Sequence, residues 1–281
     1  MKKTSLNFFM MKHSGKIIVY LILLLGVYVM LDPFLRMIFT SFKTYKESMR
    51  IPPVLLPDEF ILDNFKRIFS MHIGRYYLNT ILVTIGITAG QLVFSVTAAY
   101  AFARIPFPGR NVLFMILLAM LMVPSQLTLI PKYGMTIQMG LYNTLWGIIV
   151  PNAFSITVMF FMRQAFMSLP RELDDAARID GYSHFGIFWH IALPLSTSVL
   201  AAMGVLVALF AWNNLLWPIV VTGNDRMRVL SVFIAAMHGE HNVKIPELMA
   251  AGTLSVMPML LVFIFGQKYF VTALTITGIK E

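Results

Sequence analysis

The chain alternates between long segments that carry almost no charged residues and shorter polar connections. The long segments lie at 17–39, 76–103, 111–131, 133–162, 191–224 and 248–267. A helix of about 20 mostly apolar residues crosses the hydrocarbon core of a bilayer. A single span in lipid can satisfy its backbone hydrogen bonds only as a helix. The pattern therefore predicts an all-α, polytopic membrane protein with six transmembrane helices.

The N-terminus combines basic residues with an apolar segment, as a secretory signal peptide does. The basic residues are Lys2, Lys3, Lys12 and Lys16. No small-x-small cleavage site follows the apolar segment, and Asp32-Pro33 leads instead into further apolar sequence as far as Phe39. We therefore expect a retained first membrane helix that is kinked near Pro33.

The composition is that of a membrane protein. Hydrophobic residues make up 58% of the 281 positions and charged residues only 12%, whereas soluble domains carry about 25% charged residues. A net charge of +9 could indicate nucleic-acid binding. The basic residues occur singly at the ends of apolar segments, however, so we expect them to contact membrane lipid headgroups and expect no nucleic acid partner. The absence of cysteine excludes disulfides and thiolate metal sites.

The basic residues also bear on orientation. The connections on the two sides carry similar numbers of Lys and Arg, so their count does not select a topology. The basic N-terminal flank favours the cytoplasmic side, because the first helix usually dominates topology. We expect cytoplasmic tails at 1–16 and 272–281 around a six-helix membrane domain at 17–271. The connection at 163–195 then also lies in the cytoplasm.

That connection contains the signals of a short helix. Pro170 suits a first helical turn, and Gly181 stands where a left-handed cap would end the helix. Three acidic residues lie near the positive end of the helix dipole: Glu172, Asp174 and Asp175. The sequence after Gly181, YSHFGIFWH, is aromatic and amphipathic, and Pro194 opens the fifth membrane helix.

One face of this short helix suits contact with another protein. The face comprises Leu173, Ala176, Ala177 and Asp180, at helical spacing. The two alanines would allow a partner to approach closely, and the neighbouring carboxylates would pair with its basic residues. We interpret the connection as a docking surface; an ordinary connecting loop with a surface helix is the alternative.

The same stretch resembles the cytoplasmic signature of the permease subunits of ATP-binding-cassette importers. That signature is Glu-Ala-Ala, three residues, Gly, nine residues and Ile-x-Leu-Pro. This chain has Asp175-Ala176-Ala177, Gly181 and Ile191-Ala192-Leu193-Pro194 at the matching spacing. The resemblance implies that the loop forms coupling helices seated in a cleft of a cytoplasmic ATPase. The ATPase-coupling residues it implies are Glu172, Asp175, Ala176, Ala177, Gly181, Ile191, Leu193 and Pro194.

Other stretches are similar to the carbohydrate branch of this family, especially to the smaller permease subunit of the maltose type. They are TSFK (40–43), AAYAFARIPFPGR (98–110), WNNLLWP (212–218) and the ending QKYFVTALTITGIKE (267–281). In the family, a Gly-x-Lys ending reaches the seam between two ATPase subunits. Gly278 and Lys280 match that ending.

The resemblance implies a permease subunit that forms half of the pathway for a sugar or oligosaccharide in the cell membrane of a bacterial-type cell. It implies four kinds of partner: a sister permease, a cytoplasmic ATPase dimer, an extracytoplasmic solute-binding protein and the sugar itself. ATP and magnesium would be bound by the ATPase, and no cofactor is expected in this chain. The chain contains no G-x-x-x-x-G-K-[ST] phosphate loop, so we expect a transport subunit that is not itself an enzyme.

The chain departs from the family signature at two positions. It has Asp175 where members usually carry Glu, and Tyr182 where a small residue commonly follows the glycine. The Asp175 side chain is shorter than Glu by one methylene group. Glu172 and Asp174 are the candidates to compensate for its shorter reach toward the ATPase.

Two other classes of membrane protein are alternatives. An ion-coupled secondary transporter usually needs ionisable residues inside the membrane, and Asp32 and Arg36 are the only candidates here. A membrane enzyme would need converging acid, base or metal ligands. His238, Glu240 and His241 lack a further ligand nearby in sequence, so we expect a polar loop there and no metal site.

Polar and small residues within the apolar segments have structural and functional interpretations. Gly86 and Gly90 give the second span a small-residue face for close helix packing. Asn213 and Asn214 are candidates to line the transport pathway, because polar residues within a span often face a cavity. Hydrogen bonding between helices is the equally common alternative.

Overall fold

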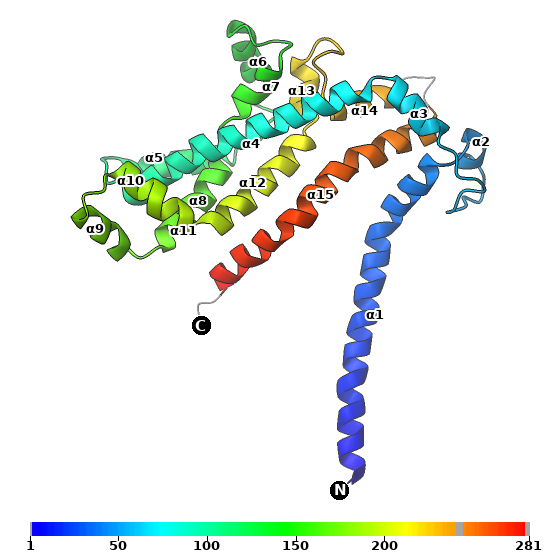
Figure 1. The fold of residues 1–281 in the computed structure, drawn as a ribbon, viewed down its shortest axis with the longest axis horizontal. Helices are drawn as coiled ribbons and strands as arrows, with labels where there is room; N and C mark the ends of the chain where they lie inside the picture. Colours follow the sequence, from blue (N-terminus) through cyan, green and yellow to red (C-terminus); the bar gives the residue numbers. More distant parts are fainter. Residues whose placement is uncertain (1, 240–243, 279–281) are drawn as a thin grey trace. The chain divides into compact units, whose positions relative to one another are not determined.

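The computed structural model describes the backbone of residues 2–239 and 244–278, which is helical with connecting turns and contains no strand (Figure 1). The all-α prediction is therefore confirmed. The chain divides into two compact units. Unit 1 comprises residues 1–71 and 240–254, and unit 2 comprises residues 72–239 and 255–281.

Unit 1 is built around the first membrane helix. Its elements are α1 (Lys2–Ser41), α2 (Tyr45–Ser48), α3 (Asp63–Ser70) and the first part of α15 (Ile245–Gly278). The apolar part of α1, Ile18–Ser41, is long enough to span a bilayer and runs through Pro33. The predicted first membrane helix is present as one helix, and both its retention and the kink near Pro33 stay predictions.

Polar side chains fasten the end of α1 to the connection that follows it. The Asn64 side chain donates hydrogen bonds to the carbonyl oxygens of Ser41 (2.8 Å) and Lys43 (2.9 Å), which satisfies groups left free at a helix end. Arg67 on α3 pairs with the buried Glu247 on α15 at 3.3 Å. Unit 1 is thus held together by short-range polar contacts as well as by packing.

Unit 2 contains the remaining helices. They are α4 (Ile73–Arg104), α5 (Arg110–Met120), α6 (Leu129–Gln138), α7 (Leu145–Ile149), the 3₁₀ turn η1 (Val150–Asn152), α8 (Ile156–Ser168), α9 (Glu172–Ile179), α10 (His184–Ile187), the π-helical turn η2 (Phe188–Ala192), α11 (Leu193–Leu195), α12 (Thr197–Trp212), α13 (Leu216–Val221), α14 (Leu230–Gly239) and the rest of α15.

The core of unit 2 forms where α4 packs against α8 and α12. The glycines of α4 allow a close approach of α7 and of the turn after η1: a Cβ atom on Gly86 would lie 2.7 Å from the Ile149 side chain, and one on Gly90 would lie 2.9 Å from Ala153. Ser95 adds a polar contact, because its hydroxyl accepts a hydrogen bond from the Ser155 amide at 2.8 Å. The predicted small-residue face is confirmed, and its neighbours belong to this chain.

The third and fourth predicted spans have different boundaries in the structure. The segment predicted at 111–131 contains the eleven-residue α5 and then a non-helical stretch around Pro124. The segment predicted at 133–162 is interrupted by turns in which Gly140 and Asn143 have φ of 70° and 56°. A left-handed backbone at these two positions ends α6 and redirects the chain before α7.

The fifth predicted span is also broken. Helix α12 begins at Thr197 and not at Pro194, after a 79° bend between His184–Leu195 and Thr197–Trp212. The pair Leu145–Asn152 and Ile156–Ser168 is bent by 43°. By length and composition, the described residues contain three single helices that could cross a membrane, and two more spans if each bent pair crosses as one. A polytopic membrane protein is confirmed, whereas the 111–131 segment is not one continuous helix.

Candidate coupling surface

The short charged helix predicted in the 163–195 connection exists as α9. Its first turn contains Glu172, Asp174 and Asp175, whose charges favour the positive end of the helix dipole. The helix starts at Glu172 with Arg171 as N-cap, so Pro170 precedes the first turn instead of lying in it. The acidic start of the helix is as the sequence predicts.

Gly181 ends α9 through a Schellman motif. Its φ of +85° lies in the left-handed region. The Gly181 amide donates to the Arg178 carbonyl at 3.0 Å, and the Tyr182 amide donates to the Ala177 carbonyl at 2.9 Å. These two bonds are the pair that defines the motif. The predicted left-handed glycine cap is confirmed.

Asp174 fastens α9 to the membrane helices of unit 2. Its carboxylate lies 3.1 Å from the Arg104 guanidinium, and the two side chains are only 12% and 5% exposed. Asp174 is therefore committed to an internal ion pair. The expectation that Asp174 could compensate for the shorter Asp175 toward a partner is wrong, because the helix turns Asp174 inward.

Arg104 also binds the end of α8. Its guanidinium donates to the carbonyl oxygens of Phe166 (2.5 and 3.0 Å) and Leu169 (2.7 Å). These carbonyls are among those that have no partner within a helix at its C-terminal end. Arg104 is the last residue of α4, so one side chain joins the ends of α4 and α8 to the start of α9.

The opposite side of α9 is exposed. Asp175 is 69% exposed and pairs with Arg178 on the same helix, at 3.6 Å. Ile179 is 87% exposed, although it is a large apolar residue. Ala176 lies on this outer side, whereas Ala177 is buried within the chain. The interpretation of both alanines as contact residues is therefore wrong for Ala177, whose small size lets α9 pack against its own unit.

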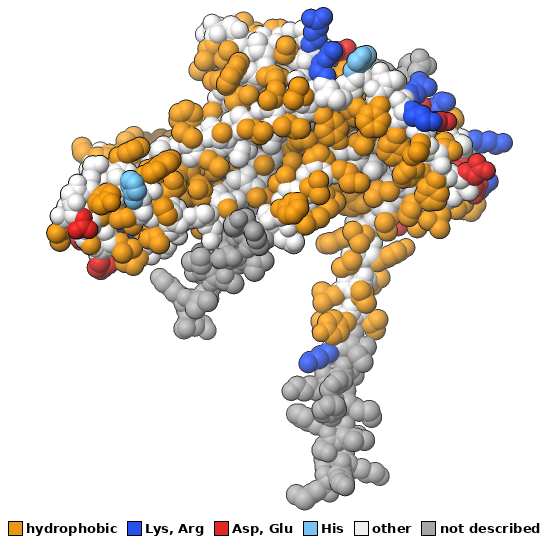
Figure 2. Space-filling view, in the orientation of Figure 1, with side chains coloured by type: hydrophobic (Ala, Val, Ile, Leu, Met, Phe, Trp, Pro, Cys, Tyr) orange, Lys and Arg blue, Asp and Glu red, His pale blue; other side chains and the backbone are white. Residues whose placement is uncertain are grey.

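The aromatic sequence after Gly181 extends this outer surface. Phe185 and Trp189 are exposed and stack with their ring centres 6.5 Å apart. The Tyr182 ring covers Gly186, where a Cβ atom would lie only 2.8 Å from it. Figure 2 shows acidic side chains gathered at the α9 end of unit 2, next to hydrophobic ones. We call the exposed residues Glu172, Asp175, Ala176, Ile179, Tyr182, Phe185 and Trp189 the coupling surface.

The end of the signature lies at the bend that leads into α12. Ile191 is in the π-helical turn, and Leu193 and Pro194 form α11 just before the 79° bend. Ile191 and Leu193 are half-buried against the hydrophobic core, and Pro194 is exposed. These three residues therefore shape the path of the chain and lie at the margin of the coupling surface.

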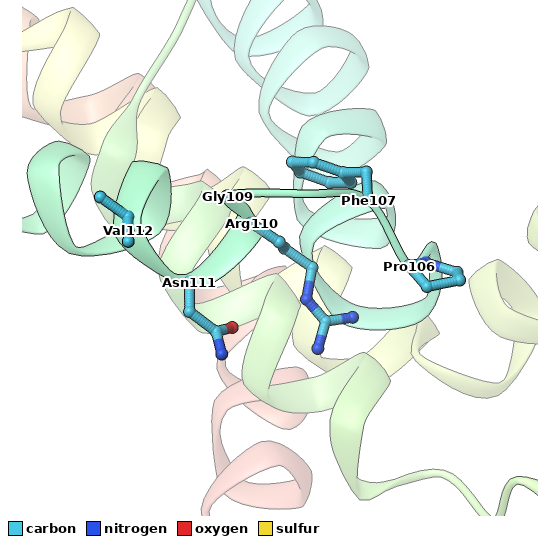
Figure 3. Close-up of a pocket in the computed structure, with 6 residues that line it drawn as sticks. All are labelled: Pro106, Phe107, Gly109, Arg110, Asn111 and Val112. Carbon is cyan, nitrogen blue, oxygen red and sulfur yellow. The ribbon is translucent and has the colours of Figure 1, made fainter.

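Basic residues line a hollow beside α9. A hollow of about 290 Å³ is lined by Ala103, Arg104, Pro106, Arg110, Arg171, Asp174, Asp175 and Arg178. The neighbouring turn between α4 and α5 lines a second hollow of about 340 Å³. Figure 3 shows Arg110 and Asn111 extending to one side of this turn and the Phe107 ring to the other. The two aspartates offset part of the arginine charge in the first hollow.

The two candidate pathway residues have different surroundings. Asn214 lines a cavity of about 390 Å³ between α4, α8 and α12. Asn213 does not line this cavity; it caps α12, and its side-chain amide donates to the Leu209 carbonyl at 2.8 Å. A pathway role is therefore retained for Asn214, and the alternative structural role fits Asn213.

The C-terminal prediction is only partly within the described residues. Gly278 is the last residue of α15, so the region predicted as a tail is helical at 272–278. Lys280 lies outside the described residues, as do Glu240 and His241. Among the described residues, no group of three or more His, Cys, Asp or Glu side chains could hold a metal ion.

Comparison with known proteins identifies the class of this helical membrane protein. Residues 91–276 match the family "Binding-protein-dependent transport system inner membrane component". The chain is 38% identical over 253 residues to the arabinooligosaccharides transport system permease protein AraQ of Halalkalibacterium halodurans, which covers 88% of this chain and 90% of AraQ. The chain belongs to this family of transport permeases, and it is a membrane subunit of a binding-protein-dependent transport system.

Further relatives cover almost the whole chain. The sn-glycerol-3-phosphate transport system permease protein UgpE of Brucella abortus is 29% identical, over 94% of this chain and 97% of UgpE. A chain of a bacterial ABC transporter involved in the import of the acidic polysaccharide alginate has the same fold, with a TM-score of 0.81 and 23% identity. That likeness covers 92% of this chain and 97% of the other.

Sequence reasoning missed two features of the site. It counted Arg104 only as a charge at a membrane boundary, although its position at the end of a charge-free span is where an arginine can reach neighbouring helix ends. It also gave no contact role to Ile179, Phe185 or Trp189. Apolar residues so close to a charged helix were the available signal for an exposed apolar patch.

Proposed function

We propose that the chain forms half of the membrane pathway of an ATP-driven importer for a sugar or oligosaccharide. Its partners in this proposal are a sister permease, a cytoplasmic ATPase dimer that binds ATP and magnesium, and an extracytoplasmic solute-binding protein. Both termini and α9 lie on the cytoplasmic side of a bacterial-type cell membrane. The arabinooligosaccharide permease relative supports a carbohydrate as the solute.

One observation carries the proposal: an exposed, mixed acidic and apolar surface is rigidly joined to membrane helices. The buried Arg104–Asp174 pair at 3.1 Å and the Arg104 bonds to α8 supply that connection. A partner that moves α9 must therefore also move the ends of α4 and α8. This geometry suits a subunit that receives mechanical work and performs no covalent chemistry of its own.

The proposed sequence of events follows from these contacts. ATP binding closes the ATPase dimer, which displaces the coupling surface. The Arg104 connection passes this displacement to α4 and α8, and the membrane helices rock against those of the sister permease. The pathway then opens to the opposite side, which is alternating access. The residues proposed to meet the ATPase are those of the coupling surface, and Gly181 holds α9 in the required orientation.

The residues on which ion coupling would depend are already paired. Asp32 and Arg36 lie one turn apart on α1 and form an ion pair at 2.7 Å. A proton relay is a chain of ionisable groups along the ion path, and one pair on a single helix does not form such a chain. This pair supports ATP-driven transport over an ion-coupled mechanism.

The proposal is tested with the importer reassembled in vesicles from this chain, the sister permease, the ATPase and the binding protein. We expect Ile179→Asp to lower ATP-dependent uptake of arabinotriose by at least about tenfold, because it places a charge at the centre of the apolar contact. The same change on α6, Ile130→Asp, is the control, since Ile130 is also strongly exposed.

Two results would contradict the proposal. One is unchanged uptake in Ile179→Asp, with the variant folded as judged by its melting curve. The other is uptake that persists without ATP and stops when the membrane potential is removed, which would favour ion coupling.

A further inference from the structure

The cavity of about 390 Å³ in unit 2 has a lining without charged residues. Its polar lining consists of Gln91 on α4, Asn152 on η1, Ser155, Thr157 on α8, and Asn214 after α12. Its apolar walls include Phe161 and Phe210. Cavities of this size, mostly apolar with a few placed polar groups, are typical of small-molecule sites.

Two of the amides are held in fixed orientations. The Gln91 side-chain nitrogen donates to the Asn152 carbonyl oxygen at 2.9 Å. The Asn152 side-chain oxygen accepts from the Lys132 ammonium at 2.8 Å, and its nitrogen donates to the Ile148 carbonyl at 2.7 Å. Lys132 itself does not line the cavity; it lies over the Trp217 ring, 4.3 Å from its centre. Burial lowers the pKa of Lys132 to about 8, so the ammonium form that holds Asn152 prevails at neutral pH.

Other polar atoms at the cavity keep free hydrogen-bonding capacity. Among the residues whose side chains the structure describes (16, 18–239 and 244–267), none is a partner of the Gln91 side-chain oxygen, the Thr157 hydroxyl or the Asn214 side-chain nitrogen. They comprise an acceptor, a hydroxyl that can donate or accept, and a donor. A ligand with several hydroxyl groups could satisfy all three.

The apolar walls suit the C–H faces of a ligand that carries several hydroxyl groups. The Phe161 and Phe210 rings are uncovered, with exposed fractions of 46% and 76%. A sugar ring has hydroxyl groups around its rim and C–H groups on its faces, so it suits amides beside aromatic rings. A phosphate or carboxylate is instead recognised by Arg or Lys through charge-assisted hydrogen bonds. The lining provides no such cation.

We propose that this cavity is a transit site for an uncharged sugar unit of the imported oligosaccharide. Gln91, Thr157 and Asn214 hydrogen-bond its hydroxyl groups, and the two phenylalanine rings contact its C–H faces. The inference rests on the proposed function and deepens it, because it restricts the solute to neutral carbohydrates. It separates this chain from relatives named for sn-glycerol-3-phosphate and from an importer of acidic alginate.

The test uses the reassembled importer in vesicles, with arabinotriose as the neutral probe and sn-glycerol-3-phosphate as the anionic probe. We expect the wild type to import arabinotriose and not sn-glycerol-3-phosphate. The double variant Gln91→Ala/Asn214→Ala should import arabinotriose at least about tenfold more slowly, because two hydrogen bonds to the sugar are lost. Its ATPase rate should still rise when the loaded binding protein is added.

Asn213→Ala is the matched control, because it removes the neighbouring amide that does not line the cavity; its uptake should equal the wild type. Thr157→Val, which removes a single hydroxyl from an open position, gives a second measurement if the double variant does not assemble. It should slow arabinotriose uptake several-fold.

The outcomes separate this inference from the proposed function. If the variants import arabinotriose at the wild-type rate, the transit site is overturned and the proposed function is not affected. If the variants lose both uptake and the stimulation of the ATPase by the binding protein, the transit site is also overturned, because the residues would then act in helix packing. Import of sn-glycerol-3-phosphate in place of arabinotriose overturns the neutral solute class. If the wild-type importer hydrolyses ATP but imports no sugar, the carbohydrate function itself is overturned.

Discussion

Arg104 is the residue on which the structural account of coupling depends most. It is the last residue of α4, and its guanidinium reaches the final carbonyls of α8 and the Asp174 carboxylate of α9. An unpaired buried guanidinium is costly, so each of these partners stabilises the position of the others. The position of α9 is thus set by a residue about 70 positions earlier in the chain.

Asp174→Asn should therefore destabilise the folded chain. The substitution removes the negative charge beside a guanidinium that is only 5% exposed, and breaking a buried pair costs about 3 kcal/mol. The melting temperature of the detergent-solubilised chain measures this effect. Asp175→Asn is the control, because the Asp175 pair is exposed and such pairs contribute less than about 1 kcal/mol. Equal melting temperatures for the two variants would contradict the assignment of Asp174 as the inward-facing partner.

The contrast between Asp174 and Asp175 also shows what single-residue reasoning could predict. The composition of the first helical turn was predicted from the sequence, because acidic residues favour that position. Which of two adjacent carboxylates faces the membrane helices depends on the rotation of α9 about its axis. That rotation is fixed by Arg104 and by the packing of Ala177, and neither contact has a signal within α9 itself.

At the scale of elements, Gly181 controls where α9 ends. Its φ is +85°, and a Cβ atom added to it would have no other atom within 4 Å, so a side chain here meets backbone strain but no clash. Gly181→Ala should destabilise the chain by about 1–2 kcal/mol, the cost of a left-handed conformation for a residue with a Cβ atom. Gly181→Asn should cost less, because asparagine tolerates that region better.

Gly134 provides a control for this prediction. It lies within α6, also has open space where a Cβ atom would lie, and has no positive φ. Gly134→Ala should stabilise the chain by up to about 1 kcal/mol, because alanine favours a helix. Thermal unfolding of both variants measures the difference. Stabilisation by Gly181→Ala as well would show that the left-handed cap does not form.

The elements were predicted well where charge marks their ends and poorly where it does not. Arg104 ends α4 within one residue of the predicted boundary at 103. The breaks at Pro124, Gly140 and Asn213 fall inside charge-free segments, so the hydropathy pattern does not reveal them. Such breaks are tolerated at membrane depth where other parts of the protein or a water-filled cavity satisfy the backbone. The turn residues themselves were the remaining signal.

At the scale of the whole molecule, the sequence predicted the class of protein better than its internal architecture. The spacing from Asp175 to Pro194 and the charge-free segments indicated a transport permease, which the family match confirms. The cavity at Gln91 and Asn214 could not be predicted, because its walls come from α4, α8 and α12. Those helices pack together only in the folded protein, and residue spacing along the sequence does not predict which helices pack against each other.

The central claim is that a cytoplasmic ATPase binds the exposed face of α9. The chain has no cysteine, so Ile179→Cys introduces a single thiol at a side chain that is 87% exposed. In intact membranes containing the complete importer, we predict that a short thiol-to-amine cross-linker joins this variant to the ATPase subunit. Ile130→Cys, at an exposed position on α6, should give no such product. Labelling of the Ile179→Cys thiol by a membrane-impermeant maleimide added outside the cell, without any cross-link to the ATPase, would contradict the account.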